Sequence, residues 1–194
     1  MNLKVEETAI PGVRIFTPAV HGDARGFFVQ TYHEREYREA GLDARFVQDN
    51  HSHSCEGTVR GLHYQLKHCQ AKLVSVVKGA VLDVAVDIRA GSPWFGKHVM
   101  VELSEENHRQ LFVPRGFAHG FRVLRGPADF TYKCDDFYAP GDEYGVTWDD
   151  PALGLDWTGG GRWPLTGEWV ISEKDRRAPK LAEVAAEFLP KYQG

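Results

Sequence analysis

The stretch KLVSVVKGAVLDVAVDI, residues 72–88, is the clearest strand signal in the chain and decides the fold. Its apolar residues are interrupted only by Ser75, Asp83, Asp87 and a Lys78-Gly79 pair. β-branched residues favour strands, and a Lys-Gly pair between two such runs is typical of a tight turn. We therefore predict an antiparallel β-hairpin over these residues.

Similar short runs lie on both sides of this stretch. They are rich in Val, Phe, Tyr and Thr, are bounded by turn residues, and cover residues 13–18, 26–32, 45–52, 58–65, 97–103, 110–114, 120–124 and 129–134. Only two segments look helical: residues 33–40, which Gly41 closes, and residues 179–189, which precede Pro190. Many strands with few helices predict an all-β jelly roll, a barrel or sandwich with short peripheral helices, whose interior can hold one ligand.

Length and composition restrict the possible classes of protein. A chain of 194 residues without repeats fits one domain, and its 42% hydrophobic and 26% charged residues are ordinary globular values. No apolar run approaches the roughly 20 residues that span a bilayer, and the N-terminus lacks a secretory signal, so we expect a cytoplasmic protein without membrane contact. The net charge of −4 disfavours a nucleic-acid partner.

The cysteines and histidines carry less information one at a time. Cys55, Cys69 and Cys134 are odd in number and lack C-x-x-C spacing, which argues against a disulfide framework and a thiolate zinc site. Among the nine histidines, His63 lies in the strand-like run RGLHYQ, residues 60–65. Strict alternation places Arg60 and His63 on opposite faces of a strand, whereas a β-bulge at the intervening glycine would turn both into one cavity.

Two further polar residues have competing interpretations. His119 lies in PRGFAHGF, residues 114–121, which reads as a turn between two apolar strands. Such a histidine either serves function at a barrel rim or hydrogen-bonds the backbone of the turn. Lys72 opens an apolar strand, where the simplest interpretation is an edge lysine facing water.

Six runs of sequence together resemble one known family. They are FVQDNHS, RGLHYQ, QAKLV, VPRGFAHGF, YKCDDFYAP and ISEKD, beginning at residues 46, 60, 70, 113, 132 and 171. In this order and spacing they resemble the dTDP-4-dehydrorhamnose 3,5-epimerase family, and the resemblance extends from about residue 10 to residue 178. It implies a cupin jelly-roll homodimer that needs no metal or other cofactor. It also implies epimerisation at carbons 3 and 5 of dTDP-4-dehydro-6-deoxy-D-glucose, which gives dTDP-4-dehydro-L-rhamnose, the precursor of L-rhamnose.

The resemblance also implies roles for individual residues. Both stereocentres flank the carbon-4 ketone, so removal of either proton gives an enolate that can be reprotonated on the opposite face. His63 matches the base and Asp175 its partner, which would orient the imidazole and raise its basicity. Tyr132 matches the acid on the other face of the sugar, and Lys72 the cation that stabilises the enolate oxygen.

The family pattern assigns the remaining site residues to binding of the nucleotide sugar. Tyr138 matches the ring that stacks on thymine, and residues 25–28 resemble an N-terminal arm that reaches the partner subunit's site. Gln30 replaces a glutamate of the family, and Ala71 replaces a glycine before the lysine. The full set of substrate-binding candidates is Arg25, Phe28, Gln30, Gln48, Asn50, Arg60, His119, Tyr138, Glu143 and Lys174. We expect a single cupin-like epimerase domain over 1–194, with the N-terminal arm at about 1–45 and a C-terminal helical extension at about 179–194.

Three other functions compete with this one. A 3-epimerase of a dTDP-4-keto-6-deoxy sugar needs the same chemical groups and inverts only one centre. A metal-dependent cupin enzyme would use histidines such as His51 and His53, which have a ligand-like spacing. A non-catalytic sugar-nucleotide binding module would keep the binding residues but lack the base or the acid, and all four candidate catalytic residues are present.

Overall fold

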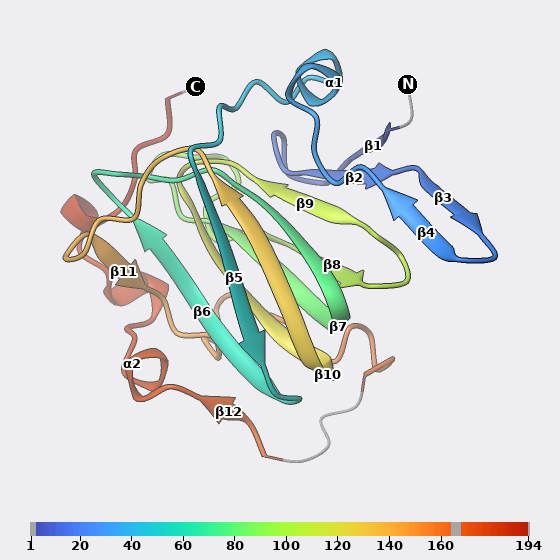
Figure 1. Ribbon diagram of the computed structural model, residues 1–194. Coiled ribbons are helices and arrows are strands. Elements are labelled where there is room, and N and C mark those ends of the chain that lie inside the picture. The colour runs from blue at the N-terminus through green and yellow to red at the C-terminus, as the bar shows by residue number, and fades with distance from the viewer. Residues whose placement is uncertain (1–2, 164–167, 194) are drawn as a thin grey trace.

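Two long strands, β7 (Lys72–Asp87) and β10 (Phe117–Cys134), form the frame of the protein. They pair antiparallel along nearly their whole length in a computed structural model that describes residues 3–163 and 168–193. The prediction of a hairpin over residues 72–88 is therefore wrong, because the chain continues through Gly79 as one strand. Figure 1 shows both strands at the centre of the molecule.

The Lys78-Gly79 pair makes a bulge instead of a turn. Lys78 pairs with Asp129 and Ala80 with Arg125, so the extra residues of β10 around Pro127 lie opposite Gly79. Gly79 has a φ of 77°, and a Cβ there would lie 2.6 Å from the carbonyl oxygen of Arg125. The glycine is thus needed for a bend within the strand rather than for a reversal of the chain.

Both long strands exchange neighbours at this bend. The first half of β7 pairs with β9 (Gln110–Val113) and its second half pairs with β8 (His98–Ser104). The first half of β10 pairs with β6 (Thr58–Gln65) and its second half pairs with β5 (Gln48–Ser54). Because the strands pass from one half of the barrel to the other, their inward side chains line one continuous interior.

Shorter strands complete the sheet. Within the described residues it follows the order β1-β2-β9-β7-β10-β6-β11, with β12 on β6. The bounds of the added strands are Leu3–Glu7 for β1, Arg14–Pro18 for β2, Glu143–Gly145 for β11 and Val170–Ile171 for β12. The main core between the two halves consists of residues such as Val74, Val81, Leu111, Phe121 and Phe130. The predicted all-β, cupin-like class is confirmed, and β1, β11 and β12 are additions to the predicted strands.

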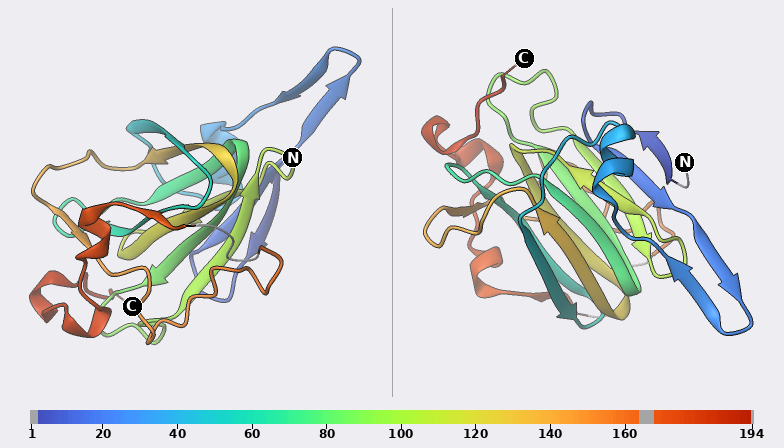
Figure 2. Two further views of the ribbon diagram at one scale, coloured as in Figure 1. Left: turned by 90° about the horizontal axis from the view of Figure 1, so that it is seen from below. Right: turned by 45° about the horizontal axis from the view of Figure 1, so that its top comes forward.

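The N-terminal region bears a separate two-stranded hairpin, β3 (Val20–Asp23) and β4 (Gly26–Val29). It projects away from the barrel in both views of Figure 2. Phe27 and Phe28 on this hairpin are 64% and 66% exposed. Two adjacent aromatic residues this exposed usually mark a contact surface rather than a free end.

The helices are few and short. The predicted helix at 33–40 is confirmed as α1 (Glu34–Glu39), which His33 caps at its N-terminus. Residues 179–189 form two 3₁₀ turns, Leu181–Glu183 and Ala186–Phe188, because Val184 and Ala185 between them are extended. The helix α2 (Glu173–Arg176) was not predicted. None of the helices in residues 3–163 and 168–193 is long and apolar enough to cross a membrane.

Candidate active site

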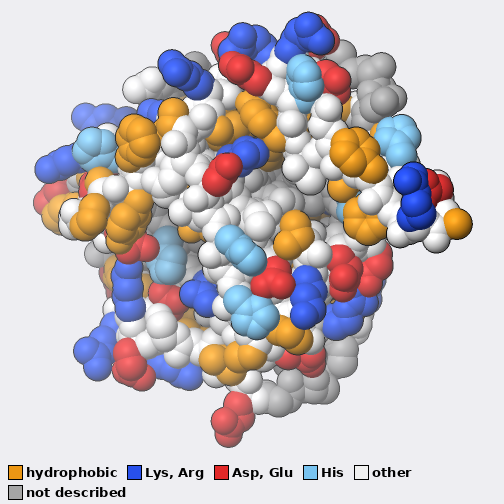
Figure 3. Space-filling model, viewed as in Figure 1, with side chains coloured by type: hydrophobic (Ala, Val, Ile, Leu, Met, Phe, Trp, Pro, Cys, Tyr) orange, Lys and Arg blue, Asp and Glu red, His pale blue; other side chains and the backbone are white. Residues whose placement is uncertain are grey.

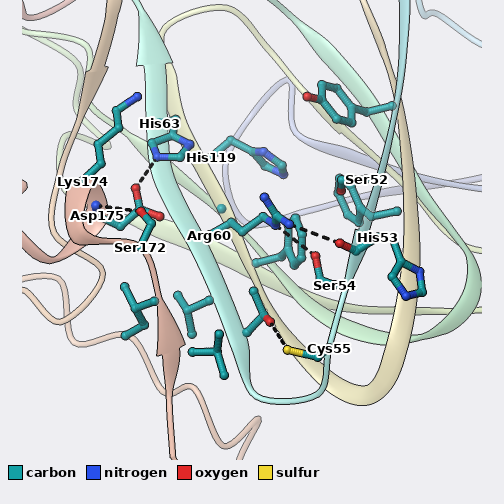
Figure 4. Close-up of a pocket in the computed structure, with 18 of the residues that line it drawn as sticks. Ser52, His53, Ser54, Cys55, Arg60, His63, His119, Ser172, Lys174 and Asp175 are labelled. Atoms are coloured by element: carbon teal, nitrogen blue, oxygen red, sulfur yellow. Dashed lines mark hydrogen bonds and ion pairs between the residues drawn. The ribbon is translucent and has the colours of Figure 1, made fainter.

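A cavity of about 630 Å³ opens between the strands of the barrel and the segment that carries β12 and α2. Its polar residues come from β5, β6, β7, β10, β11 and α2, and Figure 4 shows His63, His119, Arg60 and Asp175 around it. A second cavity of about 340 Å³ adjoins it. His63, Lys72, Tyr132 and Glu143 line both cavities, so these four side chains lie at their junction. In Figure 3, histidines lie among acidic and basic side chains on this face of the molecule.

A bulge in β6 directs two candidate residues into the same cavity. His63 pairs with His119 and Arg60 pairs with Phe121, so two residues of β6 lie opposite Gly120 alone. Gly61 within the bulge has a φ of 104°, and a Cβ there would lie 2.6 Å from the carbonyl oxygen of His119. Only glycine fits this close approach of two backbones, and Arg60 and His63 both line the larger cavity as the bulge predicts.

His63 forms a close pair with Asp175 of α2. Its Nε2 lies 2.6 Å from Asp175 Oδ1, although the two residues are 112 positions apart in the chain. The other carboxylate oxygen lies 3.4 Å from the backbone nitrogen of Gly61, which donates to it, and Ser172 Oγ accepts from the backbone nitrogen of Asp175 at 3.1 Å. The cap residue of α2 thereby fixes where the carboxylate points.

The charge of Asp175 is stabilised by the same contacts. Burial by itself would raise the pKa of Asp175, but the hydrogen bond and charge of His63, together with the Gly61 and Ser172 contacts, outweigh burial and lower it. The side chain of Asp175 is 5% exposed, whereas that of His63 is 30% exposed. The carboxylate is therefore anionic and enclosed, while the imidazole remains accessible from the cavity.

Tyr132 and Lys72 come from the neighbouring strands β10 and β7. The Lys72 ammonium lies 5.7 Å from the centre of the Tyr132 ring. Burial lowers the pKa of Lys72, partly offset by nearby Cys134, Glu143 and Asp83. Burial raises the pKa of Tyr132, so the phenol remains protonated well above neutral pH. Tyr132, in its protonated form, and Lys72 thus line the same two cavities as the His63 imidazole.

His119 is a buried strand residue, and its prediction as part of a turn is wrong. The turn ends at Gly116, and β10 begins with Phe117. His119 Nε2 lies 3.0 Å from both oxygens of Asp83, which is fully buried on β7. Asp83 was not among the sequence candidates, although a carboxylate inside an apolar strand requires a partner and so signals such a pair.

The second cavity contains four of the ten candidates for binding of the nucleotide sugar. Gln48, Asn50, Tyr138 and Glu143 line it. Tyr138 Oη donates to Glu143 Oε2 at 3.2 Å, and Lys174 Nζ donates to the same oxygen at 2.5 Å. Burial would raise the pKa of Glu143, but Lys174, His63 and Tyr138 lower it.

Arg60 is held at the edge of the larger cavity. Its Nε donates to Ser54 Oγ at 3.0 Å, and Nη2 donates to the carbonyl oxygen of His53 at 3.3 Å. Ser54 is 4% exposed and was not a sequence candidate. The remaining guanidinium edge is available to an anion in the cavity, since a guanidinium has five N–H donors.

Three candidates lie outside both cavities of their own chain. Arg25 forms an ion pair with Asp23 at 2.6 Å on the projecting hairpin and is 90% exposed. Phe28 lies on the same hairpin, and Gln30 Nε2 donates to Glu36 Oε2 at 3.4 Å near α1. Arg25, Phe28 and Gln30 therefore do not join the site that His63 and Asp175 form.

The proposed metal ligands His51 and His53 are both held by a carboxylate of the neighbouring strand β10. His51 Nε2 and His53 Nδ1 contact Asp129 Oδ1 at 3.2 and 2.7 Å. His53 also lines the larger cavity, whereas His51 lines neither of the two. Within residues 3–163 and 168–193, no three His, Cys, Asp or Glu side chains are grouped as a metal site requires.

A cupin-like barrel with a histidine–carboxylate pair beside a tyrosine and a lysine has the arrangement of a sugar-nucleotide epimerase. The family model of dTDP-4-dehydrorhamnose 3,5-epimerase matches residues 7–183. The chain belongs to this family.

Individual relatives agree with that assignment. The dTDP-4-dehydrorhamnose 3,5-epimerase of Pseudomonas aeruginosa is 50% identical over 182 residues, 93% of this chain and 97% of the relative. That of Shigella flexneri is 52% identical over 183 residues, with the same coverage of 93% and 97%. The crystal structure of dTDP-6-deoxy-D-glucose-3,5-epimerase RmlC from Legionella pneumophila, in complex with dTDP-4-keto-L-rhamnose, has a TM-score of 0.93 and 48% identity and covers 99% of this chain and 100% of that one. ChmJ, a 3'-monoepimerase from Streptomyces bikiniensis, has a TM-score of 0.86 at 35% identity and covers 97% and 93%.

Proposed function

We propose that this protein converts dTDP-4-dehydro-6-deoxy-D-glucose to dTDP-4-dehydro-L-rhamnose by inverting carbons 3 and 5. The observation that carries the proposal is the convergence of the His63–Asp175 pair, Tyr132 and Lys72 in one cavity. The relatives from P. aeruginosa and S. flexneri, both named as 3,5-epimerases, are about as similar to this chain as the structure from L. pneumophila.

His63 acts as the base through Nδ1. Because Nε2 is occupied by Asp175 at 2.6 Å, Nδ1, which lies 3.8 Å from Glu143 Oε1, is the ring nitrogen left to take a proton from the sugar. The Asp175 carboxylate keeps the proton of the neutral ring on Nε2 and stabilises the imidazolium that forms. Once the base has taken the proton from carbon 3 or carbon 5, the electrons of that C–H bond move toward the carbon-4 oxygen.

Lys72 stabilises the oxygen on which this charge develops. An enolate oxygen carries more negative charge than the ketone from which it forms, so a fixed ammonium stabilises the intermediate more than the substrate. Tyr132 then donates the phenolic proton to the opposite face of the same carbon and recovers a proton from solvent, while the His63 imidazolium releases its proton to solvent. Two such rounds, one at each carbon, give double inversion.

Binding of the nucleotide is assigned to the second cavity and to the adjoining part of the larger one. Tyr138, which lines the second cavity, stacks on the thymine ring, and Arg60 and Lys174, which line the larger cavity, bind the diphosphate as cations. Local cations are needed because the protein as a whole is acidic. Gln48, Asn50, His119 and Glu143 provide hydrogen bonds. Arg25, Phe28 and Gln30 serve the site of a partner subunit, in a homodimer completed by the projecting hairpin.

Single inversion at carbon 3 is the second candidate, because the similar structure of ChmJ is that of a 3'-monoepimerase. An NMR assay of the purified protein in deuterated water separates the two. Deuterium at both carbon 3 and carbon 5 of inverted product supports the double epimerase. Inversion confined to carbon 3 rejects it in favour of the narrower enzyme.

A further inference from the structure

The segment of residues 135–142 between β10 and β11 carries Tyr138 and is held from outside by side-chain amides. Gln70 Nε2 donates to the carbonyl oxygen of Asp136 at 2.7 Å. Gln48 Oε1 accepts from the backbone nitrogen of Tyr138 at 2.8 Å. The backbone of this segment therefore depends on side chains of other elements for part of its hydrogen bonding.

Gln65 makes the most extensive of these contacts. Its Nε2 donates to the carbonyl oxygen of Phe137 at 3.3 Å, and its Oε1 accepts from the backbone nitrogen of Ala139 at 2.9 Å. The same Nε2 donates to the carbonyl oxygen of His68 at 2.6 Å. One amide thus bonds the backbone on both sides of Tyr138, as a neighbouring strand would.

Because Gln65 is buried, loss of its hydrogen bonds would be costly. Gln65 is 6% exposed, so water cannot readily replace the amide, and loss of its contacts leaves buried backbone groups unpaired. The Tyr138 side chain, in contrast, is 50% exposed and would have rotational freedom if its backbone moved. If the ring had to become ordered on binding, the conformational entropy lost would weaken the affinity of the protein for the nucleotide.

Gln65 also lies on the strand that carries the proposed base. It follows His63 by two positions on β6, and its Cα partner on β11 is Glu143, which accepts from the Tyr138 hydroxyl. The backbone contacts of Gln65 and the hydroxyl contact of Glu143 therefore hold Tyr138 from two ends. β6 links the position of the ring to that of the imidazole.

We propose that Gln65 is a positioning residue that presets Tyr138 for stacking on the nucleotide base. It acts through the backbone of residues 137–139. Its side chain also lines the second cavity, so the test must separate this role from direct contact with the ligand. The inference rests on the proposed function, because it requires that Tyr138 contributes to binding of the thymine nucleotide.

A double-mutant cycle on dTDP affinity tests this role. Gln65→Met preserves length and removes all three hydrogen bonds, and Tyr138→Ala removes the ring. Calorimetric titration with dTDP should show about tenfold weaker binding for Gln65→Met and about 5- to 150-fold weaker binding for Tyr138→Ala. The double variant should bind no more weakly than Tyr138→Ala, because a positioning residue has nothing left to position. Additive losses, or unchanged affinity of Gln65→Met, overturn the inference.

Gln110→Met is the matched control. Gln110 is 4% exposed, its amide hydrogen-bonds the Thr31 carbonyl and the Tyr37 hydroxyl, and it lines neither of the two site cavities. Gln110→Met should lower the melting temperature without weakening dTDP binding. If Gln110→Met weakened dTDP binding as much as Gln65→Met, the effect of Gln65→Met would be one of general destabilisation. If Gln65→Met does not fold, Gln65→Glu keeps the acceptor for Ala139 and should still be non-additive with Tyr138→Ala. Unchanged affinity of Tyr138→Ala would overturn the proposed stacking itself, whereas additivity overturns only the role of Gln65.

Discussion

At the scale of single residues, the ionisable side chains of the site differ in how burial and neighbouring groups shift their pKa values. Asp175 is enclosed and bound by His63, Gly61 and Ser172, and these contacts hold its pKa low. Burial lowers the pKa of Lys72 and raises the pKa of Tyr132, because in both cases it disfavours the charged form. A neutral phenol and a cation of reduced pKa consequently occupy the same cavity, and each can be tested separately.

Tyr132→Phe should separate proton exchange from inversion. The ring is retained while the donor is lost, so His63 can still remove a proton and return it to the original face. We expect inversion to slow by about 10²- to 10⁴-fold while deuterium from solvent still enters recovered substrate, as followed by NMR. His63→Ala is the companion variant and should lose both exchange and inversion. Inversion at near the parent rate in Tyr132→Phe contradicts the assignment of the two faces.

Lys72 should determine how activity falls at alkaline pH. A lysine is charged below its pKa, and burial lowers the pKa of Lys72, so its charge disappears at lower pH than that of an exposed lysine. We expect kcat/KM to fall as pH rises through that value. Lys72→Arg should be slower but free of this fall, because a guanidinium stays charged. An unchanged alkaline fall in the arginine variant would assign the fall to a group other than Lys72.

The buried pair of His119 and Asp83 should matter first for stability. Asp83→Ala leaves His119 Nε2 without its partner, and we expect a loss of about 1–3 kcal/mol in the free energy of unfolding, measured with urea. Asp83→Asn keeps an acceptor of the same shape and should lose less. Equal stability of the alanine variant and the parent would show that the pair contributes nothing to folding.

Individual residues differ in how far the sequence could predict them. His63 and Arg60 were linked through the expected bulge at Gly61, because a glycine inside a strand has a local and recognisable purpose. Asp83 carried a signal of its own as a carboxylate among apolar residues. Ser54 and Gln65 carried none, because Ser54 acts on the Arg60 side chain and Gln65 on backbone atoms of another segment, and no local pattern specifies either contact.

At the scale of elements, glycines decide how the strands of the site bend. Gly61 and Gly79 each have positive φ and each faces a carbonyl oxygen of the neighbouring strand at a distance that excludes a side chain. The sequence suggested a bulge at the first and a turn at the second. The second prediction failed because a bulge depends on both paired strands. The extra residues of the partner strand, around Pro127, lie 48 positions from Gly79 in the sequence, so no local pattern reveals them.

Gly61→Ala should damage activity more than a comparable change elsewhere. The added Cβ would lie 2.6 Å from a backbone oxygen, so the bulge must move, and with it Arg60 and His63. We expect a loss of about 1–3 kcal/mol in stability from strained φ alone and a large fall in kcat. Gly91→Ala is the control, because Gly91 also has positive φ but open space around it. Similar activity of the two variants would separate the bulge from catalysis.

At the scale of the whole molecule, the exposed hairpin contrasts with the enclosed barrel. Arg25 and Phe28 lie on β3 and β4 or their connection, outside both cavities of the same chain. The sequence resemblance assigned them to a partner's site, and the projection of the hairpin in Figure 2 gives such an arm the freedom to reach another subunit.

Mixing two inactive variants tests this arrangement. Arg25→Ala removes a candidate binding residue from the arm, and His63→Ala removes the proposed base from the barrel. Each homodimer should therefore have impaired activity. In a mixed dimer, the arm of the His63→Ala subunit meets the intact barrel of the Arg25→Ala subunit and restores one complete site. We expect activity to appear when the two proteins are unfolded together and refolded, with separately refolded samples as the control. A mixture no more active than its components contradicts exchange of arms.

The division of the cavity between barrel strands and the segment at residues 135–142 has a consequence for the diversification of such enzymes. The proposed proton-transfer groups lie on β6, β7, β10 and α2, whereas Tyr138, the proposed stacking ring, lies on a connection between strands. We therefore expect substitutions within that connection to change nucleobase preference with less effect on the proton-transfer groups than substitutions in the barrel strands. Diversification of ligand choice should accordingly begin in this connection.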